Sequence, residues 1–171
     1  MVTRRQAGAA IALAVVWGLT MSGCTPQPEP APSASATGFA SDEEAFAAAE
    51  ATYRAYVDAT NARRLDPDSR PDPTDFLTGQ ALTSSINAQR RFEEEGIRLV
   101  GITAVESVSR VSRTATATTI QVCLNNSGTK VLDTGGTDVT PPDRPTSGGL
   151  EVVIVNANQQ VSLSSTNDSG C

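Results

Sequence analysis

The sequence predicts an α+β domain in which N-terminal helices pack on a curved, mostly antiparallel β-sheet. Two segments with apolar residues at helical spacing come first, whereas the regular segments after Gly96 are rich in β-branched residues that alternate with polar ones. A parallel sheet would need helices between its strands, so this segregation favours antiparallel pairing. The 171 residues suffice for one such domain and a targeting segment.

The first helix is expected to begin after Ser41. Glu44 follows that serine at the spacing of a capping box, and acidic residues crowd the first turn, where they complement the helix dipole. Arg63 and Arg64 complement the dipole at the other end, so the helix should end near them. The apolar stripe of this helix consists of Phe46, Ala49, Tyr53, Tyr56 and Val57.

A second helix is expected over residues 79–95. Residues 65–73 contain prolines and charged side chains that cannot continue the first helix, and a short turn is expected over residues 75–77. Gly96 is the predicted stop of the second helix. Its stripe consists of Ala81, Leu82, Ser85, Ile86, Ala88 and Phe92.

Five strands are expected after the helices. They cover residues 97–111, 114–124, 129–133, 150–156 and 161–165. Residues 125–128, Asn-Asn-Ser-Gly, predict a hairpin turn between the second and third strands, because Asn and Gly tolerate positive φ. The strands should form an antiparallel meander that curls over the helices.

The N-terminal residues have the order of an export signal. Arg4 and Arg5 precede an apolar stretch over residues 7–20, which ends at Met21-Ser22-Gly23-Cys24. This last segment resembles the lipobox of bacterial lipoproteins. The resemblance implies that residues 1–23 are removed by cleavage between Gly23 and Cys24, that the Cys24 thiol carries lipid, and that the protein is anchored at the outer face of the cell membrane.

Two other interpretations of this segment stay open. An uncleaved anchor is disfavoured because about 14 apolar residues are short for about 30 Å of hydrocarbon. Plain secretion would need cleavage elsewhere. The general secretory route is favoured over twin-arginine export, because the positions around Arg4 and Arg5 match the twin-arginine pattern poorly.

Residues 24–40 are expected to form the lipidated cysteine and an extended tether. Four prolines alternate with other residues there, and no apolar periodicity offers a face to bury. A polyproline-like chain of this length reaches at most about 50 Å, enough to lift the domain of residues 41–171 off a lipid surface. A proline-rich recognition motif is the less favoured alternative.

The helices-first order occurs together with Tyr53-Arg54-Ala55-Tyr56 in the first helix, Cys123 in a middle strand and a terminal Ser169-Gly170-Cys171. With these features the domain resembles the nuclear transport factor 2-like, cystatin-like cone found in actinobacterial lipoproteins. Enzymes of this fold use aspartate, tyrosine or arginine at the mouth of the cone. The candidate pocket residues are therefore Tyr53, Tyr56, Asp58 and Arg90, although tyrosines on a helix also fit a packed core.

Three cysteines in an exported chain leave one over after pairing, and lipidation of Cys24 accounts for it. Cys123 and Cys171 are then free to form a disulfide, which would stabilise the fold by about 4 kcal/mol in the chain-entropy model. A pair of reduced thiols at a redox or metal site is the alternative, but CxxC spacing is absent.

Several kinds of chemistry are excluded by composition. The chain contains no histidine, so catalysis through an imidazole base and most zinc sites are excluded. Removal of residues 1–23 would change the net charge from −6 to −8, because Arg4 and Arg5 are lost. The remaining cations are scattered among acids, which excludes nucleic-acid binding. No cofactor or metal is expected.

Two acidic patterns near the connection between the third and fourth predicted strands suggest more specific functions. Asp133-Thr134-Gly135 resembles the signature of retroviral-type aspartic proteases, but the sequence has no second copy to share the proton, and the segment is an ordinary strand end. Asp133, Asp138 and Asp143 suggest calcium, but they lack EF-hand spacing. A solvated loop is the favoured interpretation of both.

We therefore expect a non-catalytic domain, anchored to the membrane, that binds a small apolar ligand, a cell-wall component or another envelope protein. The alternative is an isomerase or hydrolase with a carboxylate base in the cone. A buried aspartate paired with a tyrosine would favour the enzyme. A cavity filled by side chains would remove the small ligand.

Overall fold

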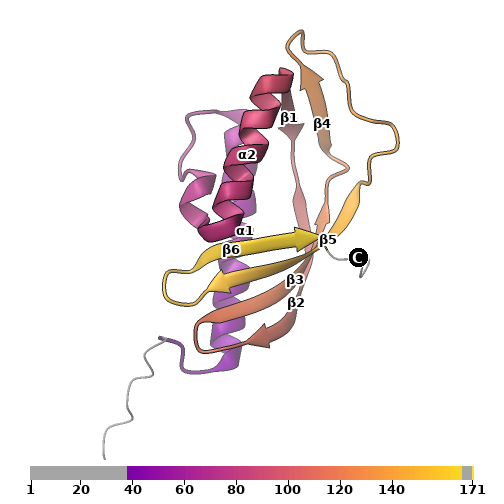
Figure 1. Ribbon diagram of the computed structural model, residues 1–171. Coiled ribbons are helices and arrows are strands. Elements are labelled where there is room, and N and C mark those ends of the chain that lie inside the picture. Colours follow the sequence, from indigo (N-terminus) through magenta and orange to yellow (C-terminus); the bar gives the residue numbers. More distant parts are fainter. Residues whose placement is uncertain (1–37, 167–170) are drawn as a thin grey trace, which may run out of the picture. The chain divides into compact units, whose positions relative to one another are not determined.

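The computed structural model describes residues 38–166 and 171, all of which belong to one compact unit of the chain (Figure 1). The predicted signal peptide over residues 1–23, the predicted lipidation site Cys24 and all but the last residues of the predicted tether lie outside the described residues. The predictions about export and lipidation therefore stay predictions.

The two expected helices are confirmed. Helix α1 spans Asp42–Leu65, and the Ser41 hydroxyl accepts a hydrogen bond from the Glu44 N–H at 3.1 Å. Helix α2 spans Gly79–Glu95 and ends at Gly96, whose φ of 63° is left-handed. The short turn begins slightly earlier than expected, as the 3-10 helix η1 over Pro73–Phe76, because Asp72 caps it.

The strands form two antiparallel sheets. The larger sheet has the order β2-β3-β5-β6, with β2 over Ala104–Arg113, β3 over Ala117–Asn125, β5 over Ser147–Val155 and β6 over Gln160–Thr166. The smaller sheet pairs β1, Ile97–Gly101, with β4, Thr129–Asp133. Figure 1 shows this smaller sheet running beside α2. The α+β class with helices preceding antiparallel strands is thus confirmed.

The predicted hairpin at residues 125–128 is wrong. Strand β3 pairs with β2 and β5, and β4 pairs with β1, so these residues redirect the chain without reversing it. The predicted single strand over residues 97–111 breaks at the same level, between Gly101 and Ala104. Because β2 pairs with β3 and β1 pairs with β4, residues 97–133 form one long hairpin that reverses between Arg113 and Ala117. The Ile102 N–H reaches the Gly128 carbonyl at 3.3 Å, so both arms of this hairpin bend together.

The core lies between the helices and one face of the larger sheet. Alternate residues of β3 and β5 point inward, as expected for a sheet with one covered face. Helix α1 packs over β2 and β3, and α2 lies along β6. The principal buried side chains are Tyr53 and Val57 of α1, Leu77, Ala81 of α2, and Ile120, Val122, Val152, Ile154 and Val161 of the sheet.

Cys123 and Cys171 are joined by a disulfide, with Cα atoms 5.4 Å apart. Cys123 alternates with the inward-facing Val122, so the bond attaches the terminal residue to the sheet face that is turned away from the helices.

The bend in the long hairpin requires glycine at position 101. Gly101 has a φ of 86°, and a Cβ atom there would overlap the carbonyl oxygen of Gly128. We expect Gly101→Ala to lower the free energy of unfolding by about 2 to 4 kcal/mol, measured by urea denaturation, because it adds backbone strain and a steric clash. Gly148→Ala is the matched control: its Cβ meets open space, so the change should stay within about 0.5 kcal/mol. Equal effects of the two substitutions would contradict this account of the bend.

Candidate functional site

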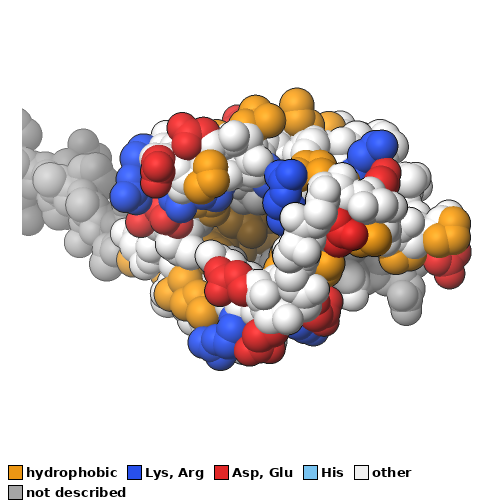
Figure 2. Space-filling model, turned by 90° about the horizontal axis from the view of Figure 1, so that it is seen from above, with side chains coloured by type: hydrophobic (Ala, Val, Ile, Leu, Met, Phe, Trp, Pro, Cys, Tyr) orange, Lys and Arg blue, Asp and Glu red, His pale blue; other side chains and the backbone are white. Residues whose placement is uncertain are grey.

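A cleft of about 1010 Å³ opens between α1, α2, strand β1 of the smaller sheet and strands β3, β5 and β6 of the larger sheet. Seen from above, it is a hollow with an apolar floor and charged side chains on its rim (Figure 2). This volume is at the upper end of the range of small-molecule sites, about 300 to 1,000 Å³. Apolar residues that line it include Leu82, Ile86, Phe92, Ile97, Leu99, Leu124 and Leu150.

The cleft exists because only the first part of α2 packs closely on the sheet. Ala81 is 9% exposed and belongs to the core. Ile86 and Phe92 are 43% and 37% exposed, although both line the cleft. Large apolar side chains left open to solvent in a concave surface are typical of binding sites.

Two of the four predicted pocket residues line this cleft. The rings of Tyr53 and Tyr56 lie with their centroids 5.8 Å apart, and both contribute to the wall. Tyr53 is only 2% exposed, so it also belongs to the core, as the alternative interpretation had it. Burial raises the pKa of both phenols, and each is therefore neutral at physiological pH.

The other two predicted pocket residues lie elsewhere. Asp58 is exposed beside a separate hollow of about 270 Å³, and Arg90 is exposed on α2 without lining the cleft. Each follows a cleft-lining residue, Tyr56 or Ala88, by two positions, which is a rotation of about 200° around a helix. The helical period therefore turns Asp58 and Arg90 away from the side of each helix that lines this cleft.

A polar network that sequence reasoning missed contributes Arg64, Thr103 and Asn126 to the lining of the cleft. The Asn61 side chain accepts from the Thr103 N–H at 3.0 Å and donates to the Thr103 carbonyl at 2.8 Å. Arg64 donates from Nη1 to the Thr103 hydroxyl at 2.9 Å, and that hydroxyl donates to the Asn126 side chain at 2.9 Å. The end of α1 is thus tied to the bends of both strands.

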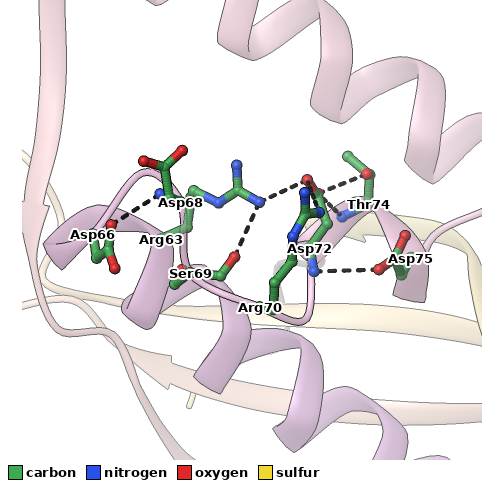
Figure 3. A network of polar contacts seen from close by, with 8 residues as sticks. All are labelled: Arg63, Asp66, Asp68, Ser69, Arg70, Asp72, Thr74 and Asp75. Carbon is green, nitrogen blue, oxygen red and sulfur yellow. Dashed lines mark hydrogen bonds and ion pairs between the residues drawn. The ribbon is translucent and has the colours of Figure 1, made fainter.

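At the rim, Arg63 holds the loop between α1 and η1 (Figure 3). Its Nη2 donates to Asp72 Oδ2 at 2.6 Å and to the Ser69 carbonyl at 3.3 Å. The Thr74 hydroxyl and N–H donate to Asp72 Oδ1, and these hydrogen bonds, helped by Arg63, hold the pKa of Asp72 below its ordinary value. Asp72 is therefore an ionised structural group.

The carboxylates of the cleft already accept hydrogen bonds from their neighbours: Asp72 from Arg63 and Thr74, and Glu93 from Gln89. Only Asp72 and Glu93 line it among the described residues, and neither has a hydrogen bond to a tyrosine. Within residues 38–166 and 171, no group of three acidic or thiol side chains comes together as a metal site would require. The Asp133 carboxylate accepts the Thr137 N–H at 2.8 Å in the turn after β4.

Comparison of the chain with protein families, curated proteins and solved structures finds no match. No helix in the described part of the chain is long and apolar enough to cross a membrane.

Asp72→Ala tests the rim network through its pH dependence. A carboxyl group whose pKa is lowered by folding stabilises the fold above its unfolded pKa of about 4, and this contribution is lost as the pH falls through the lower folded pKa. We expect the substitution to lower the free energy of unfolding by about 1 to 2 kcal/mol at neutral pH, with the difference from the parent shrinking in acid. Asp68→Ala is the control, since Asp68 is exposed in the same loop. A difference that persists unchanged at low pH would contradict this role of Asp72.

Proposed function

We propose that this chain is a non-catalytic, lipid-anchored binding protein whose domain holds a small apolar ligand in the cleft. The observation that carries the proposal is the pair Ile86 and Phe92, which line the cleft and remain 43% and 37% exposed. Burial of apolar surface contributes about 25 cal/mol per Å². A ligand that covered Ile86 and Phe92 would bury apolar surface that stays exposed to water in the unliganded protein, and this burial would favour binding.

The alternative enzyme has less support. An isomerase or hydrolase of the type considered from sequence needs a carboxylate free to take a proton. Asp72 is held by Arg63 and Thr74, and Asp58 lies outside the cleft. Glu93 lines the cleft but accepts its hydrogen bond from Gln89 of the same helix and none from a tyrosine. A binding role needs none of this chemistry.

The nuclear transport factor 2-like cone belongs to the same proposal. Helices α1 and α2 cover one face of a sheet whose β1–β4 part is bent away from the rest, and the cleft lies inside this arrangement. A cone of this kind would present its mouth to solvent. We propose this fold relationship on the order and packing of the elements alone.

Ala88→Trp tests the cleft as the binding site. Ala88 lines the cleft, so an indole there should occupy part of its volume. We expect the parent protein to bind the neutral fluorescent probe N-phenylnaphthylamine and the variant to bind it at least about tenfold more weakly, measured by fluorescence titration. Ala47→Trp on the exposed face of α1 is the matched control and should leave binding unchanged. Absence of probe binding to the parent, or equal binding by the two variants, would refute the proposed site.

Cys24→Ser tests the anchor. The lipobox implies that the Cys24 thiol carries lipid, and serine lacks a thiol to accept it. We expect the parent to fractionate with membranes and the variant to be lost from them, with intact-mass measurement showing a lipid adduct on the parent alone. Cys171→Ser is the control, because it also removes one cysteine while leaving the lipobox intact. Membrane association that survives Cys24→Ser would refute the lipid anchor.

A further inference from the structure

Arg64 is a half-buried cation at the wall of the cleft that has no acidic partner. Its Nη1 donates to three neutral acceptors: the Thr103 hydroxyl, the Asn61 side chain and, at 3.4 Å, the Gly101 carbonyl. Among the residues that the structure describes, no carboxylate lies within ion-pairing distance of it. The adjacent Arg63, by contrast, pairs with Asp72.

Arg144 is a second guanidinium near the cleft that has no acidic partner among the described residues. Arg144 donates to the Thr129 carbonyl at 2.8 Å, the Thr129 hydroxyl at 2.9 Å and the Asn126 carbonyl at 3.3 Å, all of them neutral. Its buried Nε has no partner in the described part of the chain. Asn126 also accepts from Thr103, so one short chain of hydrogen bonds links Arg144 to Arg64. Burial lowers the pKa of Arg64, nearby Tyr56 raises it in part, and the charge of Arg144 lowers it.

Arg64 has donors that no described residue uses. Its Nε and Nη2 make no hydrogen bond to a described residue, and the side chain lines the cleft. Tyr56 shares this wall: burial raises the pKa of its phenol, whereas a hydrogen bond with Thr60 and the nearby Arg64 lower it. Two partly buried cations without an anion are costly, because desolvation removes the water that would compensate them.

We infer that the ligand is an anionic amphiphile, an alkyl chain ending in a carboxylate, with the carboxylate on Arg64 and the chain against Ile86 and Phe92. Nε and Nη2 of a guanidinium match the two oxygens of a carboxylate, so the pair forms two parallel hydrogen bonds. Tyr56 lines the same cleft and is neutral, so it adds no competing negative charge. The negative charge of the ligand compensates the Arg64 cation, and the apolar walls exclude water from the chain. This inference rests on the proposed binding function and specifies its ligand.

Two probes that differ only in their anionic end test it. Dansyl-undecanoic acid and its methyl ester are titrated by fluorescence into the full exported chain. We expect the acid to bind at least about tenfold more tightly than the ester. Arg64→Gln should abolish this preference. Arg64→Lys should keep part of it, because lysine keeps the positive charge but cannot form the bidentate pair with a carboxylate. Arg90→Gln, on the opposite face of α2, should leave the preference unchanged.

Arg64 also supports Thr103, so circular dichroism and thermal melting establish that each variant is folded. If Arg64→Gln does not fold, the test uses the parent protein alone and repeats the two titrations at high salt. We expect the preference for the acid over the ester to persist, because salt screens exposed charge pairs more than half-buried ones. Equal binding of acid and ester, or a preference for the acid that Arg64→Gln leaves intact, would refute the inference that the ligand is anionic. Neither result would contradict the proposal that the cleft binds an apolar ligand. Binding of neither probe removes the proposed function as well.

Discussion

The fold depends on one close approach, where Gly101 of the first bent strand meets Gly128 of the second. No side chain fits between these backbones, so both strands change direction at the same level. The bend leaves the backbone of Thr103 without a strand partner, and Asn61 supplies the missing donor and acceptor from α1. The β1–β4 sheet thereby turns away from the larger sheet and runs beside α2 (Figure 1).

Connectivity then prevents the cleft from closing. At its start α2 is fixed to the larger sheet, because the Thr78 N–H donates to the Val161 carbonyl at 2.8 Å and Leu77 is buried. At its end Gly96 leads directly into β1, which is paired with β4 along its length. Helix α2 is attached to the larger sheet at its start and to the smaller sheet at its end. It therefore cannot pack closely along its whole length on either sheet. Ile86 and Phe92 therefore stay exposed.

Features of the fold that depend on contacts between residues close in sequence could be predicted from the sequence. Features that depend on contacts between residues remote in sequence could not. Ser41 and Gly96 mark helix ends through bonds and backbone angles within a few residues, so both helices were placed well. The break near Thr103 depends on Asn61, which is remote in the sequence. The Asn-Asn-Ser-Gly segment has the composition of a hairpin turn, but strand pairing elsewhere makes it a bend.

The candidate site divides in the same way. Tyr53 and Tyr56 lie on the apolar stripe of α1, so periodicity could identify them as facing inward. From the sequence, Arg64 was interpreted as a cation that complements the helix dipole. This interpretation explains its position at the end of α1 but does not indicate that it has no acidic partner among the described residues. That lack is a property of the assembled cleft, since the neighbours of Arg64 come from α1, the β1–β2 bend and, through Asn126, the β3–β4 bend. The same bend that opens the apolar cleft thus surrounds Arg64 with neutral acceptors, and a charge so placed is stabilised most by an anion that arrives from outside.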